Sequence, residues 1–190
     1  MNLDELRSRQ APLKQRYRES PDSARIPARA ECELDLQDFA CVVRSWRGET
    51  IAGLHQAAGG TGELACSADM LLESLVACAG VTLRAVAVAM ALPLRAARVR
   101  AEGHWDARGT LAVDKTAPVG LTDIALTFEL DTDAEPAKIA RLVESAERFC
   151  VIAQTLRNPP RLTIEHRIVS APALPAPGFA AQDRTDAGIR

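Results

Sequence analysis

The longest apolar segment of the chain, residues 67–91, constrains the fold more than any other feature. Its residues mostly favour an α-helix, with start signals at Ser67 and Asp69 and a stop at Pro93. The only charged residues in it are Asp69, Glu73 and Arg84. A helix that is apolar around most of its circumference must be buried. We therefore expect a long central helix in the middle of the fold.

The same segment must be tested as a membrane span, because its length would suffice. A span needs about 20 apolar residues with few or no charges. Glu73 and Arg84 divide the segment into shorter stretches. The sequence therefore predicts a core helix of a soluble protein and no membrane contact.

Composition excludes several classes of protein. The chain has 190 residues and a net charge of -2, so it lacks the basic surface expected of a nucleic-acid-binding protein. Its first residues lack the basic and then apolar pattern of a signal peptide, which predicts a cytoplasmic location. An odd number of cysteines without C-x-x-C spacing argues against a disulfide scaffold and a zinc site. We therefore expect no metal and no cofactor. The five cysteines are Cys32, Cys41, Cys66, Cys78 and Cys150.

Strands and shorter helices surround the central segment. An N-terminal helical arm is expected over residues 1–25, with a kink or a division into two pieces at Pro12. Alternation of apolar and polar residues then predicts strands, which lie at 26–36, 39–46, 50–54, 98–105 and 124–131.

The C-terminal part of the chain predicts a second long helix and one more strand. A capping box at Thr132–Glu135 would begin that helix, and Asn158 followed by two prolines would end it. A last strand is expected at 161–168, and residues 170–190 form a Pro/Ala-rich tail. The order of elements indicates an α+β fold with antiparallel sheets and two long central helices. A homodimer would cover the apolar central helix.

Two cysteines occupy comparable positions, one on each long helix. Cys78 and Cys150 both lie on the apolar stripe of their helix and are 72 residues apart. If the helices pack together, the two thiols could form a redox pair, in which one attacks an electrophile and the other closes a disulfide. Two inert core cysteines are the alternative. Cys66, before the central helix, and His55, in a glycine-flanked loop, are weaker candidates.

The residues around this pair resemble the OsmC/Ohr superfamily, the osmotically inducible protein C and organic hydroperoxide resistance proteins. The resemblance lies in the Leu-rich segment 67–78, which ends in Ala-Cys, and in Ala146-Glu-Arg-Phe-Cys150. It extends over an expected OsmC-like domain at 26–169 and leaves out the N-terminal arm and the tail. After the second cysteine the family often has proline, where this chain has Val151.

The resemblance implies an intertwined homodimer and a thiol-dependent peroxidase that reduces organic hydroperoxides. Cys78 matches the peroxidatic cysteine and Cys150 the resolving cysteine, and a dithiol such as a lipoyl group would be the reductant. Asp69 is the candidate supporting carboxylate, because it adjoins the position where active members of the family carry glutamate. Such members also use an arginine from the N-terminal hairpin, for which the candidates are Arg29, Arg44 and Arg47. The alternative is a dimeric binding protein of the same fold that holds an apolar ligand.

Overall fold

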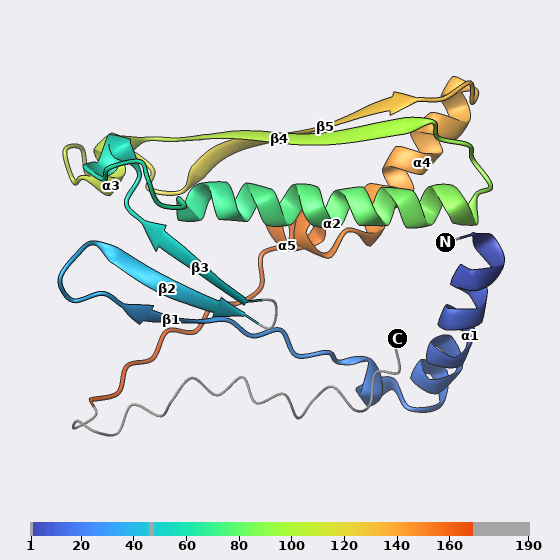
Figure 1. Cartoon of the computed structure of the whole chain (residues 1–190), viewed down its shortest axis with the longest axis horizontal. Coiled ribbons are helices and arrows are strands. Elements are labelled where there is room, and N and C mark those ends of the chain that lie inside the picture. Colours follow the sequence, from blue (N-terminus) through green and yellow to red (C-terminus); the bar gives the residue numbers. More distant parts are fainter. Residues whose placement is uncertain (1, 46–47, 169–190) are drawn as a thin grey trace.

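A long helix, α2 (Ser67–Ala89), lies along a two-stranded antiparallel sheet of β4 (Ala96–Trp105) and β5 (Leu121–Asp131) (Figure 1). The structure is a computed structural model and describes residues 2–45 and 48–168. The prediction of a central helix and of two strands after it is confirmed. The helix α3 (Ala107–Thr110) lies in the connection between the two strands.

The second helical region consists of two helices instead of the single long one that the sequence predicts. Helix α4 (Pro136–Phe149) and helix α5 (Val151–Arg157) are separated at Cys150, whose backbone is extended (φ -76°, ψ 108°). The predicted end before Asn158 is confirmed. Both helices pack against α2.

The predicted capping box at the start of this region is wrong. Glu135 is the N-cap of α4, and its side chain makes no capping hydrogen bond. The Thr132 hydroxyl instead donates to the backbone oxygen of Pro93 at 2.6 Å and accepts the N–H of Ala134 at 3.2 Å. Thr132 therefore ties the end of β5 to the segment that leaves α2.

The N-terminal strands form a separate three-stranded sheet in the order β1–β2–β3, which confirms the expected antiparallel meander. The strands are β1 (Glu31–Leu34), β2 (Ala40–Ser45) and β3 (Gly48–Gly53), so the first is shorter than predicted. The guanidinium of Arg44 pairs with Glu33 at 2.7 Å and Glu49 at 2.8 Å across the three strands. A 3₁₀ turn, η2 (Gln56–Ala58), then leads toward α2.

The N-terminal arm contains α1 (Leu3–Glu19) and a 3₁₀ turn, η1 (Pro21–Ala24), and extends from one end of α2 (Figure 1). The division expected at Pro12 does not occur, since α1 runs through this residue. No residue of α1 is buried, so water can solvate the carbonyl that proline leaves unpaired. The limits of the arm and of the domain stay a prediction.

The strand predicted at 161–168 is absent from the described chain. These residues have no strand pairing and are exposed, including the side chains of Leu162, Ile164 and Ile168 at 81%, 85% and 97%. The alternating pattern is present, but no strand within the described residues pairs with it. Arg47 and the tail at 170–190 lie outside the described residues.

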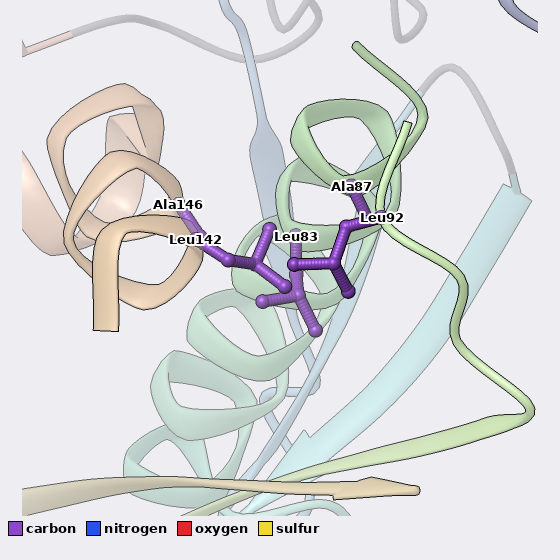
Figure 2. Packing of buried hydrophobic residues seen from close by; sticks show 5 residues of the cluster. All are labelled: Leu83, Ala87, Leu92, Leu142 and Ala146. Atoms are coloured by element: carbon purple, nitrogen blue, oxygen red, sulfur yellow. The ribbon is translucent and has the colours of Figure 1, made fainter. Parts of the chain in front are cut away.

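Two clusters of buried side chains hold the helices together. The larger one joins α2 to α4 and contains Leu83, Ala87, Leu92, Leu142 and Ala146 (Figure 2). The second joins α2 to the start of α5 and contains Leu75, Ala79, Cys150 and Ala153. Five of the nine residues in the two clusters are alanine or cysteine, whose small side chains allow the helices to approach closely.

The helix α2 is buried on one side only within the single chain. By length and composition α2 alone among the described helices could cross a membrane. The packing of α2 against α4, α5 and β4 also explains why its residues are mostly apolar. Its opposite face, with Ala77, Val81 and Arg84, remains exposed. The expectation of a fully buried central helix is therefore met only in part by one chain.

Removing a core side chain between α2 and α4 tests this packing. We expect Leu142→Ala, at a fully buried position, to lower the free energy of unfolding by about 2–5 kcal/mol in urea denaturation. The matched control Val113→Ala changes an exposed side chain and should cost less than about 0.5 kcal/mol. Equal effects of the two substitutions would contradict the assignment of this core.

Candidate active site

The structure brings Cys78 and Cys150 together. Cys78 lies midway along α2 and is partly buried, whereas Cys150 is fully buried at the junction of α4 and α5. Each thiol lies close enough to shift the pKa of the other, and both are free. A large distance between the two thiols would have excluded a redox pair, and the structure shows no such distance.

Hydrogen bonds at the helix junction favour the ionised form of Cys78. Burial alone would raise the pKa of this thiol, because a charge in the apolar core is poorly solvated. Four donors outweigh that effect and lower the pKa below its ordinary value. They are the backbone N–H of Ile152, the Cys150 thiol, the backbone N–H of Val151 and the Thr82 hydroxyl.

The pKa of Cys150 is shifted in the opposite direction. Burial raises its pKa, and the hydrogen bond to Cys78 together with the charge of Cys78 adds to this. The N–H groups of Ala153 and Ile152 oppose the rise only in part. Ala153 N–H donates to the Cys150 sulfur at 3.4 Å. Of the two thiols, Cys78 is therefore the more readily ionised.

The break between α4 and α5 supplies donors that the sequence does not predict. Cys78 lies in the middle of its own helix, so the N-terminus of that helix cannot assist it. Val151 and Ile152 are instead the first two residues of another helix, α5. Backbone N–H groups at such positions have no intrahelical partner and remain available to an anion.

The charged residues expected to support the site are not among the groups that shift the Cys78 pKa. Asp69 is exposed in the first turn of α2, nine residues before Cys78, which corresponds to roughly 13 Å along a helix. Arg44 forms ion pairs with Glu33 and Glu49 on the three-stranded sheet β1–β2–β3, and Arg29 is exposed. Within one chain, therefore, neutral donors alone among the described residues activate Cys78.

His55 and Cys66 lie together, at a different place from the cysteine pair. Both line a cavity of about 350 Å³ at the N-terminus of α2. The ring of His55 packs edge-on against Trp105, with 5.4 Å between centroids, and its Nδ1 accepts the N–H of Ala57 at 3.0 Å. Cys78 is not part of this cavity. These two residues therefore do not join the candidate site.

The surroundings of the cysteine pair are otherwise apolar. Cys78 packs against the buried cluster that contains Cys150, and so do apolar side chains of the sheet β4–β5 and of α5, which are Val99, Ala101, Ile124, Leu126, Phe128 and Ile152. Cys150 lies in the wall of an open cavity of about 480 Å³, near Phe149, Val151 and Gln154. The chemistry that this arrangement allows is attack by the Cys78 thiolate and disulfide formation with Cys150.

The model of the OsmC-like protein family matches residues 60–165, more than half of the chain, and includes both cysteines. The chain belongs to the OsmC-like family. A search for similar sequences among curated proteins finds none.

Solved structures of this family share the fold at low sequence identity. An OsmC-like protein from Mycoplasma pneumoniae has a TM-score of 0.59 and 16% identity, covering 71% of this chain and 90% of its own. An organic hydroperoxide resistance protein from Elizabethkingia anophelis gives 0.57 and 16%, covering 70% and 90%. An organic hydroperoxide resistance protein OsmC from Legionella pneumophila gives 0.55 and 17%, covering 70% and 91%. These similarities confirm the OsmC-like α+β fold.

The lowered pKa of Cys78 is tested by alkylation with iodoacetamide at different pH values. The rate at Cys78 should fall only as the pH drops through its lowered pKa, whereas Cys150 and Cys41, whose pKa values are raised, should need higher pH to react. Removing one donor in Thr82→Val should raise the Cys78 pKa. We expect the rate at pH 7 to fall roughly two- to tenfold, the equivalent of one hydrogen bond.

Thr127→Val, on the exposed face of β5, is the matched control for the loss of a hydroxyl and should leave the Cys78 rate unchanged. Peptide mass spectrometry assigns the alkylated cysteine. If the alkylation rate of Cys78 depended on pH in the same way as that of Cys150, the opposite pKa shifts of the two thiols would be contradicted.

Proposed function

We propose that the protein is a thiol-dependent peroxidase that reduces organic hydroperoxides, with Cys78 as the peroxidatic cysteine and Cys150 as the resolving cysteine. The observation that carries this proposal is the packing of Cys78 against the buried cluster that contains Cys150, with a lowered pKa for Cys78 and a raised pKa for Cys150. The names of the Legionella and Elizabethkingia proteins refer to organic hydroperoxide resistance, which supports this class of substrate.

The first step is attack by the Cys78 thiolate on the distal oxygen of the hydroperoxide. An S–O bond forms, the O–O bond breaks, and the alkoxide takes a proton and leaves as an alcohol. Cys78 is oxidised to a sulfenic acid. The hydrogen-bonded thiol of Cys150 is a suitable source of that proton, because loss of the proton also makes Cys150 a nucleophile for the next step.

The second step joins the two sulfurs. Cys150 attacks the sulfenic sulfur, an S–S bond forms, and the hydroxyl leaves as water with one proton. An external dithiol, such as a lipoyl group, then reduces the disulfide by exchange and itself becomes a disulfide. The apolar residues around Cys78 favour substrates with a hydrocarbon chain over hydrogen peroxide.

A second candidate function is a dimeric binding protein that holds an apolar ligand without turnover. One observation favours it: no charged side chain of the described chain is among the groups that shift the pKa of Cys78. Loss of thiols on peroxide treatment separates the two functions, because a binding protein would protect Cys78 without oxidising it.

The proposed catalysis is tested by treating the reduced protein with cumene hydroperoxide and counting free thiols. The wild type should lose two thiols and form a Cys78–Cys150 disulfide. Cys150→Ser should stop at a Cys78 sulfenic acid that is trapped by dimedone, and Cys78→Ser should lose reactivity by more than about 100-fold. Cys66→Ser is the control and should behave as the wild type. Oxidation of Cys78 no faster than Cys66 would refute the proposal.

We also propose that the protein acts as a homodimer in the cytoplasm. Two apolar surfaces of the single chain support this: the face of α2 that carries Val81, 70% exposed, and the alternating residues 161–168. A partner subunit that covers them would remove this apolar surface from water.

A charge on the exposed face of α2 tests the dimer. Light scattering should give the wild type twice the chain mass of 20.4 kDa, and Val81→Glu should give the mass of one chain. Val113→Glu, which places the same charge on an exposed loop, should remain dimeric. A monomeric wild type would contradict the proposal directly.

A further inference from the structure

A second pair of cysteines lies on the hairpin formed by β1 and β2. This hairpin carries neither cysteine of the proposed peroxidase site. Strand pairing places Cys32 opposite Val43 and Leu34 opposite Cys41. Side chains two residues apart on a strand share one face, so Cys32 and Cys41 lie on the same face as diagonal neighbours. The opposite face carries the ion pairs of Arg44.

The two thiols are close enough to influence each other. Burial raises the pKa of Cys41, and the charge and hydrogen bonding of Cys32 add to this. Cys32 is exposed, and Cys41 is partly buried. The pair is therefore open to solvent on one side, unlike Cys150 in the core.

The geometry of the pair suits a bridging atom better than a direct disulfide. Diagonal neighbours on adjacent strands have Cα atoms about 7–8 Å apart, whereas a disulfide requires roughly 4.4–6.8 Å. An atom bound by both sulfurs tolerates the longer spacing. The strands are also fixed by the three-stranded ladder and by the two ion pairs of Arg44, which oppose the movement that a disulfide would need.

The number of ligands limits what the bridging atom can be. Within residues 2–45 and 48–168 no group of three or more side chains could hold a metal ion, so the pair offers two thiolates and no further ligand. Zinc sites in proteins need three or four protein ligands. Soft acceptors that are satisfied by two thiolates remain, among them monovalent copper and trivalent arsenicals.

We propose that Cys32 and Cys41 form a second dithiol site, which binds a soft acceptor by bridging it between the two sulfurs. With Cu⁺, two S–H bonds break, two S–Cu bonds form and two protons are released. With a monosubstituted arsenic(III) oxide, two As–S bonds form and the oxygen leaves as water with both thiol protons. Neither reaction changes an oxidation state. The site is independent of the peroxidase proposed above.

The test uses the full chain with Cys78→Ser and Cys150→Ser as background, which removes the other close pair of thiols. Phenylarsine oxide should bind one equivalent in intact mass spectrometry and remove two titratable thiols. Excess 2,3-dimercaptopropanol should release it, whereas a monothiol at the same concentration should not. Because the chelate is lost, Cys32→Ser and Cys41→Ser should each weaken binding by roughly 10²–10⁴-fold.

Cys66→Ser, in the same background, is the matched control and should bind as the background does. A parallel titration with Cu⁺ against bicinchoninate tests the other acceptor: one tight equivalent lost in Cys32→Ser extends the site to copper, and its absence restricts the site to arsenicals. Unchanged arsenical binding in Cys32→Ser, or adducts on single thiols that a monothiol removes, would overturn the proposal. Because the background lacks both core cysteines, neither result bears on the peroxidase.

Discussion

The contact between the middle of α2 and the first turn of α5 is the interaction on which the candidate site depends. In an unbroken helix the N–H groups of Val151 and Ile152 would bond to the carbonyls four residues earlier, those of Glu147 and Arg148. The extended backbone at Cys150 frees these two N–H groups, and they face Cys78. A thiolate can therefore be stabilised inside an apolar cluster without a charged side chain of the same chain.

Small side chains make this contact possible. Ala79 follows Cys78 on α2 and is fully buried against Cys150 and Ala153. Any larger residue at these alanines would fill the space between the helices and separate the sulfurs, because a packed core does not yield without strain. The same residues thus set the packing that stabilises the fold and the close approach of the two thiols.

The sequence predicted the elements whose signals are local. The apolar run at 67–91, the alternation at 124–131 and the turn-rich meander gave α2, β5 and the hairpin sheet nearly as they are. The break at Cys150 was missed because Phe149, Cys150 and Val151 include no helix-breaking residue. The family's frequent proline after this cysteine, a residue favoured at the first position of a helix, was the one available signal. The prediction of a strand at 161–168 was wrong because the alternation of apolar and polar residues does not show whether another strand lies beside it.

The environment of each cysteine pair decides which chemistry it can perform. Cys78 and Cys150 lie among apolar side chains, and the donors around them lower the pKa of Cys78 while that of Cys150 is raised, so the attack that we propose falls to Cys78. Cys32 and Cys41 lie on two paired strands of the three-stranded sheet, where register fixes their spacing and Cys32 is exposed to solvent. The sequence placed these two residues on strands but could not pair them, because register depends on the turn between the strands. Once the register is known, a diagonal pair of thiols favours a bridging acceptor, whereas a pair at the junction of packed helices favours a disulfide.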